Sequence, residues 1–159
     1  MEAITVRDLL TAVGGTLIGP ETSLDRTVSS VDTDSRDIHP GSLFLPLVGE
    51  RFDGHTYIGS ALEAGAAGCL TAREPEHYQE GRFYIKVEDT QRALRDLAFW
   101  YKEQFRIPFV GVTGSVGKTT AKDMIASVLS VKYKVLKTEG NFNNNVGLPL
   151  TLLRLDRSV

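Results

Sequence analysis

The sequence predicts an α/β fold with two units: a small α/β domain over residues 1–106, and the start of a parallel α/β domain over residues 107–159. Two observations predict this fold class. Short apolar segments of strand length alternate along the chain with segments whose apolar residues recur at helical spacing. In addition, Arg106-Ile-Pro108 lies between two such series and marks the boundary between the units.

The first helix is expected over about residues 5–13. Thr5 and Asp8 resemble a capping box, with Asp8 in place of the more usual Glu or Gln. The apolar residues that follow recur at helical spacing, and Gly14-Gly15 ends the helix. A short amphipathic helix therefore opens the chain.

The rest of the first unit alternates strands and helices. Residues 83–87 alternate between apolar and other side chains in the register of a half-buried strand. Pro46 lacks a backbone N–H, so the apolar segment around it indicates an edge strand or a bulge. Asp89 or Thr90 is expected to cap a long helix. The expected elements are strands over 28–31, 43–48, 67–71 and 83–87, and helices over about 58–66 and 90–104.

The second unit is short. Its expected elements are a buried strand over 109–113, a tight loop over 114–117, a helix over about 118–132, a strand over 133–136, an asparagine-rich loop over 140–147 and a helix from about 148. This is little more than one strand–helix–strand unit, whereas a parallel sheet needs several such units to cover both of its faces. The chain is therefore expected to be a fragment, with one complete domain and the opening of a second.

Composition excludes several classes of protein. Eighteen basic and twenty acidic residues give a net charge of -2, which argues against broad nucleic-acid binding. A single cysteine excludes an internal disulfide framework and a multi-cysteine zinc site. No apolar run approaches the ~18 residues of a membrane span, and the N-terminus does not resemble a secretory signal. A cytoplasmic protein without membrane insertion is expected, and the sequence does not indicate an oligomeric state.

The strongest chemical signal is the segment Val112-Thr-Gly-Ser-Val-Gly-Lys-Thr-Thr120. A predicted strand leads through a glycine loop into a helix, so that backbone N–H groups and the helix dipole form an anion site typical of P-loop domains. Lys118 would reach the β and γ phosphates of a nucleotide, and the Thr119 hydroxyl would bind Mg²⁺. The predicted phosphate-binding residues are Thr113, Gly114, Ser115, Val116, Gly117, Lys118, Thr119 and Thr120.

This segment departs from the strict Walker pattern in one place. Val112 occupies the position at which that pattern has glycine, and Gly111 and Gly114 lie on either side. The alternative interpretation is a glycine turn that closes an ordinary strand–helix unit.

Four segments together resemble the Mur ligase superfamily: residues 33–36, 49–55, 113–120 and 140–150. The resemblance covers nearly the whole chain. It implies a three-domain ligase that binds a UDP-linked substrate, ATP and Mg²⁺ and makes an amide bond through an acyl phosphate, with Lys118 as a catalytic residue. The asparagine-rich segment is typical of the branch that adds D-alanyl-D-alanine to a UDP-N-acetylmuramoyl-tripeptide in peptidoglycan synthesis.

The resemblance also assigns substrate contacts outside the phosphate loop. Ser35 and Arg36 would contact uridine or its diphosphate, although an ordinary turn is the alternative. Residues of the 49–55 loop would close on uracil and ribose, and residues of the asparagine-rich loop would lie near phosphate groups. The residues concerned are Arg51, Asp53 and His55 in the first loop, and Asn141 and Asn144 in the second.

Each loop has a structural alternative. Asp53 is suited to cap the helix that follows it, and asparagine tolerates the left-handed backbone geometry of turns. For the protein as a whole, two alternatives remain. One is a self-contained nucleotide-binding or regulatory module without ligase chemistry, and the other is a ligase of the same superfamily that adds the third amino acid of the peptide.

Overall fold

The computed structural model describes residues 1–75, 77–139 and 144–159. Within these ranges, the main sheet has five strands in the order β2-β9-β8-β5-β4. Four of them are parallel, and β2 pairs with β9 in the antiparallel direction. The strands of this sheet are β2 (Thr16–Ile18), β4 (Val31–Asp32), β5 (Leu43–Phe44), β8 (Gly68–Thr71) and β9 (Phe83–Lys86). The predicted α/β class is confirmed.

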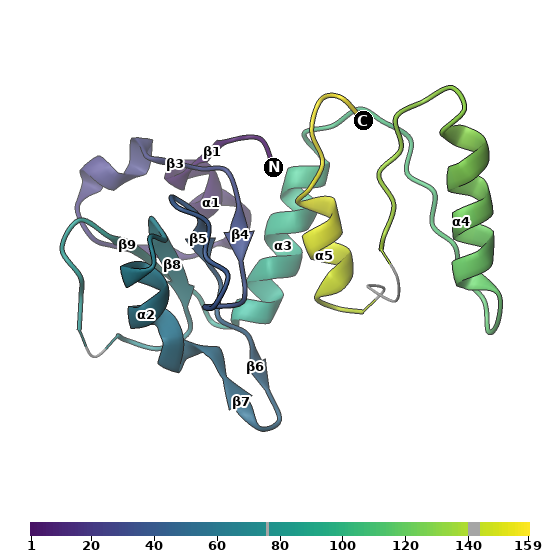
Figure 1. Cartoon of the computed structure of the whole chain (residues 1–159). Helices are drawn as coiled ribbons and strands as arrows, with labels where there is room; N and C mark the ends of the chain where they lie inside the picture. The colour runs from purple at the N-terminus through teal and green to yellow at the C-terminus, as the bar shows by residue number, and fades with distance from the viewer. Residues whose placement is uncertain (76, 140–143) are drawn as a thin grey trace.

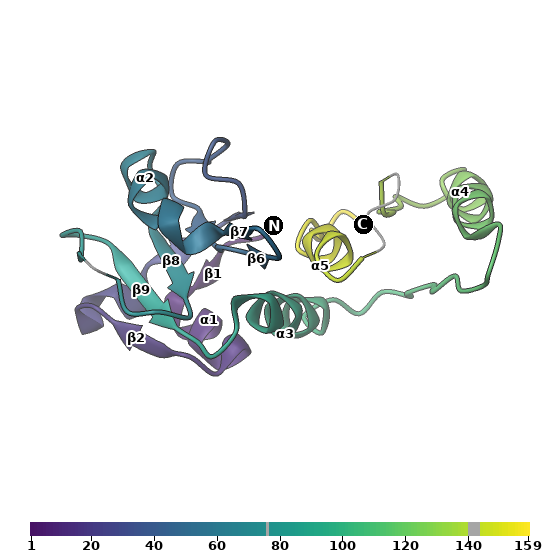
Figure 2. The same ribbon diagram turned by 90° about the horizontal axis from the view of Figure 1, so that it is seen from below.

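Helices cover both faces of this sheet. In Figure 2, α2 (Ile58–Glu63) lies on one side, and α1 (Val6–Val13) and α3 (Thr90–Lys102) lie on the other. Successive strand residues point to opposite faces, and the two cores divide accordingly. The core beneath α1 and α3 includes Leu43, Leu70 and Ile85, and the core beneath α2 includes Phe44, Cys69 and Tyr84.

The predicted helix caps are confirmed. Thr5 Oγ1 accepts a hydrogen bond from Asp8 N at 3.1 Å, and Asp8 Oδ2 accepts one from Thr5 N at the same distance. Gly14 ends α1 with a φ of 61°, in the left-handed region that glycine adopts without strain. Asp89 Oδ1 caps α3 by accepting a hydrogen bond from Arg92 N.

Two of the predicted strands of the first unit are divided. The expected strand over 28–31 is interrupted, because β3 (Thr27–Val28) pairs with β1 (Ile4–Thr5) whereas β4 joins the main sheet. The expected strand over 43–48 stops at Phe44. After Pro46, β6 (Val48–Gly49) forms a hairpin with β7 (Phe52–Asp53), and a short 3₁₀ helix follows at Gly54–Tyr57. A second 3₁₀ helix lies at Glu21–Asp25.

The strands predicted in the second unit do not form. Residues 109–113 and 133–136 are in neither sheet nor hairpin, and Phe109, Val110 and Tyr133 are exposed. A strand needs a neighbour for its backbone hydrogen bonds, and no segment of the described chain pairs with either of them. The predicted helix is present as α4 (Lys118–Leu129) and ends three residues earlier than expected. In Figures 1 and 2, α4 stands apart from the sheet.

The chain then returns to the first unit. Helix α5 (Gly147–Leu152) lies beside α3 in both views (Figures 1 and 2). Leu153 and Leu155 are buried in the same core as Leu97 and Tyr101. The sequence boundary at residue 106 therefore does not divide the core, because residues on both sides of it contribute. Within the described residues, no helix is both long enough and apolar enough to cross a membrane.

Candidate functional site

The carboxyl ends of the four parallel strands carry most of the predicted substrate residues. The loop after β4 contains Ser35 and Arg36, and the segment after β5 contains Asp53 and His55. Arg73 follows β8. The carboxyl edge of a parallel sheet is a common place for ligands, because its loops meet there. The topology therefore brings two of the predicted substrate segments to one edge.

Residues of the loop after β4 hold one another in place. Asp32 Oδ2 accepts a hydrogen bond from His39 N at 2.7 Å, which ties the two ends of the loop together. Asp34 binds the Arg36 guanidinium with both carboxylate oxygens, at 2.9 Å to Nε and 2.6 Å to Nη2. These contacts with Arg36 lower the pKa of Asp34 to about 2. The Arg36 side chain is still 87% exposed, and Asp34 engages only two of the five N–H donors of its guanidinium.

The predicted residues Asp53 and His55 form a brace. Asp53 Oδ1 accepts hydrogen bonds from His55 N at 3.0 Å and from the ring Nδ1 at 2.7 Å, and Arg73 Nη1 lies 2.6 Å from Oδ2. His55 Nε2 accepts a hydrogen bond from Ala72 N at 3.0 Å, so Nδ1 is the ring nitrogen that donates to Asp53. The His55 side chain is only 7% exposed. Its position indicates that it joins the segment after β7 to the end of β8.

Replacement of Asp53 by asparagine is expected to lower the free energy of unfolding at pH 7 by about 1–3 kcal/mol, because charge-assisted hydrogen bonds are lost. Hydrogen bonds from His55 hold the pKa of Asp53 below its usual value. Its stabilising contribution is therefore complete above the unfolded pKa of about 4 and is lost as the pH falls through the lower folded pKa.

Urea unfolding of wild type and Asp53→Asn at pH 7 and pH 3 measures this effect, and the difference should shrink at pH 3. Asp25→Asn is the control, because Asp25 is 87% exposed and pairs with Arg7 at 3.4 Å. An equal loss in both variants would contradict the brace.

Two aromatic residues of this region were missed in the sequence. Phe52 and Tyr57 stack with ring centroids 5.6 Å apart and planes inclined by 18°, and the residues are 51% and 44% exposed. Contact with Asp34 is the main cause of the raised pKa of Arg36, and Tyr57 contributes to it at longer range. The available signal was the pair of aromatic residue types, one inside the predicted 49–55 loop and one just after it. Arg51 lies beside Phe52 in the turn of the hairpin, which projects beyond the sheet in Figure 1.

The predicted phosphate loop precedes α4. Gly117 occupies the N-cap position of this helix with a φ of 75°, and no side chain caps the helix, unlike α1 and α3. The first N–H groups of α4 therefore remain available to an anion. Lys118 Nζ donates a hydrogen bond to the carbonyl oxygen of Gly114, which bends its ammonium group back over the loop. Val116, at the tip of the loop, is 87% exposed.

The asparagine-rich loop lies partly outside the described residues. Asn141 belongs to the range that is not described, so its predicted role stays a prediction. Asn144 Oδ1 accepts hydrogen bonds from Val146 N at 3.1 Å and from Gly147 N at 2.7 Å. The side-chain oxygen of Asn144 therefore supports the start of α5, and its amide NH₂ makes no hydrogen bond with another described residue.

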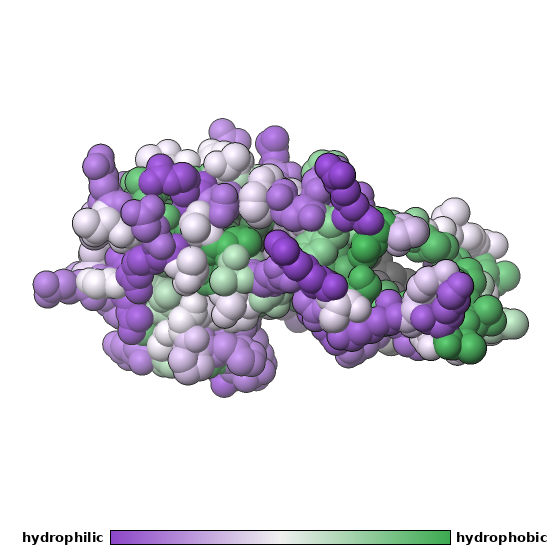
Figure 3. Space-filling view, turned by 90° about the horizontal axis from the view of Figure 1, so that it is seen from above, coloured by the Kyte–Doolittle hydropathy of each residue, from purple (hydrophilic) through white to green (hydrophobic). Residues whose placement is uncertain are grey.

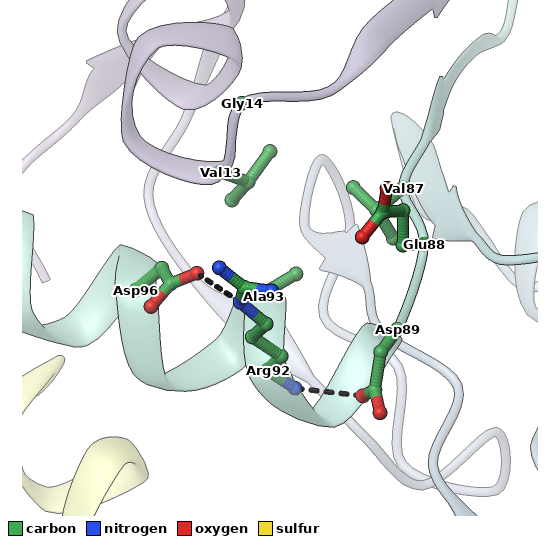
Figure 4. Close-up of a pocket in the computed structure, with 8 residues that line it drawn as sticks. All are labelled: Val13, Gly14, Val87, Glu88, Asp89, Arg92, Ala93 and Asp96. Atoms are coloured by element: carbon green, nitrogen blue, oxygen red, sulfur yellow. Dashed lines mark hydrogen bonds and ion pairs between the residues drawn. The ribbon is translucent and has the colours of Figure 1, made fainter.

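A cavity of about 250 Å³ lies between α1 and α3, away from these residues. Figure 4 shows Arg92 directed toward Asp96, and their charged groups are 3.6 Å apart. Asp89 is engaged in the cap of α3. None of the predicted site residues lines this cavity, so it is not the candidate site. Among the described residues, no group of three His, Cys, Asp or Glu side chains is placed to hold a metal ion.

The combination of a parallel sheet edge and a glycine loop before a helix suits a nucleotide-dependent enzyme, and comparison with known proteins defines the class. Residues 27–101 match the family described as "Mur ligase family, catalytic domain", and residues 112–159 match "Mur ligase middle domain". The chain belongs to the Mur ligase family.

Individual relatives show which branch of the family this chain is most similar to. The chain is 46% identical over 151 residues to the UDP-N-acetylmuramoyl-tripeptide--D-alanyl-D-alanine ligase of Bacillus subtilis. The aligned region covers 95% of this chain and 33% of that protein. It is 41% identical to the Escherichia coli protein of the same name, over 98% of this chain and 33% of the relative. The chain thus spans about a third of the length of these relatives.

Solved structures with a similar fold include members of the same branch of the family. A crystal structure of MurF from Acinetobacter baumannii matches with a TM-score of 0.89 and 33% identity, over 99% of this chain and 34% of that one. MurF from Thermotoga maritima, solved in complex with ADP, matches with a TM-score of 0.71 and 36% identity, over 78% of this chain and 28% of that one. The predicted resemblance to the Mur ligases is confirmed, and these relatives belong to the predicted branch.

Proposed function

We propose that this chain forms part of an ATP-dependent ligase that adds D-alanyl-D-alanine to a UDP-N-acetylmuramoyl-tripeptide. The relatives named above carry the proposal, together with the uncapped start of α4 behind a glycine loop. The described second unit has no closed core, since Val110 and the α4 residues Met124 and Val128 are exposed. The fragment alone is therefore proposed to be inactive, and the activity is proposed for a full-length ligase that contains this sequence.

The carboxyl edge of the sheet is proposed to bind the UDP end of the substrate. Arg36 offers a planar set of donors that suits a diphosphate, and the contact with Asp34 orients it beforehand. The exposed Phe52–Tyr57 pair offers an aromatic face beside this group. Arg51, in the turn of the hairpin, would add a second positive charge. Asp53 and His55 would act on the substrate indirectly, by bracing the loop.

ATP is proposed to bind with its phosphates at residues 113–120. Backbone N–H groups of the loop and the Lys118 ammonium would stabilise negative charge on the γ-phosphoryl group as it moves. Mg²⁺ takes oxygen ligands and is held by few protein groups when it also binds phosphates. The Thr119 hydroxyl fits that role, because it makes no hydrogen bond within the described residues and lies on the exposed first turn of α4. The ion would neutralise phosphate charge.

The proposed reaction has two steps. The terminal carboxylate of the tripeptide attacks the γ-phosphorus of ATP, so an acyl phosphate forms and ADP leaves. The amine of D-alanyl-D-alanine then attacks the acyl carbon, inorganic phosphate leaves with the bonding electron pair, and the amine loses a proton. The loop would position the reacting groups and stabilise charge, and it would form no covalent bond with the substrate or with ATP.

Phosphate release by the full-length ligase tests the proposal. Release is expected to require ATP, UDP-N-acetylmuramoyl-tripeptide and D-alanyl-D-alanine together. Release with a diamino acid and a UDP-linked dipeptide instead would identify the ligase that adds the third residue. Nucleotide binding without amide formation under either condition would support the module without ligase chemistry.

Replacement of Arg36 by alanine is expected to weaken binding of the UDP-linked substrate about 10- to 100-fold, as for the loss of hydrogen bonds to a charged group. Isothermal titration measures the dissociation constant. Arg7→Ala is the matched control, because Arg7 is also an exposed arginine paired with an aspartate, Asp25. An unchanged dissociation constant in Arg36→Ala would remove Arg36 from the proposed site.

A further inference from the structure

The segment that contains the phosphate loop is held to the first unit at both of its ends. At one end it continues covalently from α3 at Lys102. At the other end α5 lies beside α3 (Figures 1 and 2), and Leu153 and Leu155 are only 4% and 2% exposed in the core of the first unit. The position of the loop relative to the first unit therefore depends on the docking of residues 147–157, which we call the return segment.

One hydroxyl group lies at the centre of this docking. Tyr101, near the end of α3, is 1% exposed. Its Oη donates a hydrogen bond to the carbonyl oxygen of Leu155 at 2.7 Å and accepts one from Glu2 N, also at 2.7 Å. Three separate parts of the chain meet at this atom: the N-terminus, α3 and the return segment.

An outer contact reinforces the same junction. The Glu2 carboxylate accepts hydrogen bonds from Arg157 N at 3.0 Å and from Arg157 Nε at 3.1 Å. Arg157 is 87% exposed, so this pair is screened by solvent and contributes less than a buried contact. The buried hydroxyl is therefore the stronger of the two contacts.

The return segment is also connected to the phosphate-loop side. Lys122 on α4 donates a hydrogen bond from Nζ to the carbonyl oxygen of Thr138 at 2.6 Å, and Glu139 pairs with Arg154 at 2.6 Å. Contacts thus run from the helix behind the phosphate loop to the return segment, and from there to Tyr101.

We propose that Tyr101 is a positioning residue, whose hydroxyl fixes the phosphate loop relative to the UDP-binding edge through the return segment. The proposal rests on the proposed function, because it concerns the alignment of the ATP phosphates with the substrate carboxylate. Tyr101 touches neither candidate site. Loss of the Tyr101 hydroxyl therefore affects the alignment of ATP with the UDP-linked substrate and leaves the binding of each one intact.

Tyr101→Phe is the main variant, because it removes only the hydroxyl group. Tyr84→Phe is the matched control: Tyr84 is also 1% exposed, and its hydroxyl accepts a hydrogen bond from Gln79 N at 2.9 Å, in the loop between β8 and β9. Hydrogen exchange of the chain reports the docking directly. Amide exchange at residues 150–155 is expected to accelerate about tenfold in Tyr101→Phe and to stay unchanged in Tyr84→Phe.

Steady-state kinetics of the full-length ligase report the consequence. Tyr101→Phe is expected to lower kcat about tenfold with unchanged KM for ATP and for the UDP-linked substrate, since small misalignments of reacting groups reduce turnover strongly. Tyr84→Phe should leave kcat unchanged. Arg157→Ala, which alters only the exposed contact, should accelerate exchange at residues 150–155 by a smaller factor and serves as the second variant if Tyr101→Phe does not fold.

Three results would overturn the proposal: unchanged exchange at residues 150–155 in Tyr101→Phe, faster exchange with an unchanged kcat, or an equal loss of kcat in Tyr84→Phe. Failure of the wild-type ligase to form the amide bond would instead reject the proposed function. In that case the exchange experiment still decides whether the hydroxyl holds the return segment.

Discussion

Replacement of Lys118 by alanine in the full-length ligase is expected to reduce amide formation about 10²- to 10³-fold, comparable to the loss of one preorganised group that stabilises transition-state charge. Lys118 is the cationic side chain of the loop, and its ammonium lies over the Gly114 carbonyl where a phosphate oxygen would replace that contact. The effect should fall mainly on kcat, because charge on the γ-phosphoryl group develops during transfer.

The measurement is phosphate release at saturating substrates. Lys132→Ala is the control, because Lys132 is an exposed lysine just beyond the end of α4, and it should retain full activity. Binding of the UDP-linked substrate should be the same in both variants, since the carboxyl edge of the sheet does not include Lys118. Undiminished turnover by Lys118→Ala would exclude the loop from phosphoryl transfer.

Gly68→Ala is expected to destabilise the fold by about 3 kcal/mol, the upper part of the usual range for overpacking a core. Gly68 begins β8 in the centre of the sheet and pairs with Phe83. A Cβ at this position would lie 2.4 Å from the Phe83 carbonyl oxygen and 2.6 Å from its ring. A backbone oxygen has no rotamer through which to move away, so the two strands would have to separate.

Gly59→Ala is the same substitution at a permissive position. Gly59 lies exposed in α2, and an added Cβ would meet nothing within 4 Å. It should stabilise the chain by about 0.4–1 kcal/mol through helix propensity and a less flexible unfolded state. Chemical denaturation of both variants measures the contrast, and equal effects would show that the close approach of Gly68 to Phe83 is not important for stability.

The sequence predicted what depends on a few neighbouring residues. The capping box of Thr5 and Asp8 and the cap at Asp89 are local hydrogen bonds, and both are present. The glycine loop that ends at Gly117 and the helix from Lys118 were likewise readable from residue type and spacing. The family resemblance followed from short motifs of the same kind.

Predictions from the sequence were wrong where an element forms only through contacts with residues distant in the chain. The apolar pattern at 109–113 predicted a buried strand, but burial requires a partner, and this segment is exposed in the described chain. Figure 3 shows apolar residues on the surface at the end of the molecule that α4 occupies, and α4 itself leaves Met124 and Val128 exposed. Periodicity identifies an apolar face and does not identify what covers it.

Part of the candidate site was also predictable from the sequence, and part of it was not. The glycine loop and Lys118 were enough to predict a phosphate-binding site, because a cationic side chain at the start of a helix has that chemistry in any fold. The substrate role predicted for Arg36 came from the family resemblance, since its residue type alone also fits an ordinary turn. Only the tertiary structure showed that His55 is buried as a brace between Asp53 and Ala72.

By itself, the sequence determined the α/β class, the local caps and the phosphate-loop motif, since each arises from interactions within a few residues. The tertiary structure decided which strands pair, which apolar faces are covered and that the return segment docks on Tyr101. Those outcomes depend on residues as far apart in the sequence as Glu2 and Arg157, and local residue patterns do not encode which distant residues will meet.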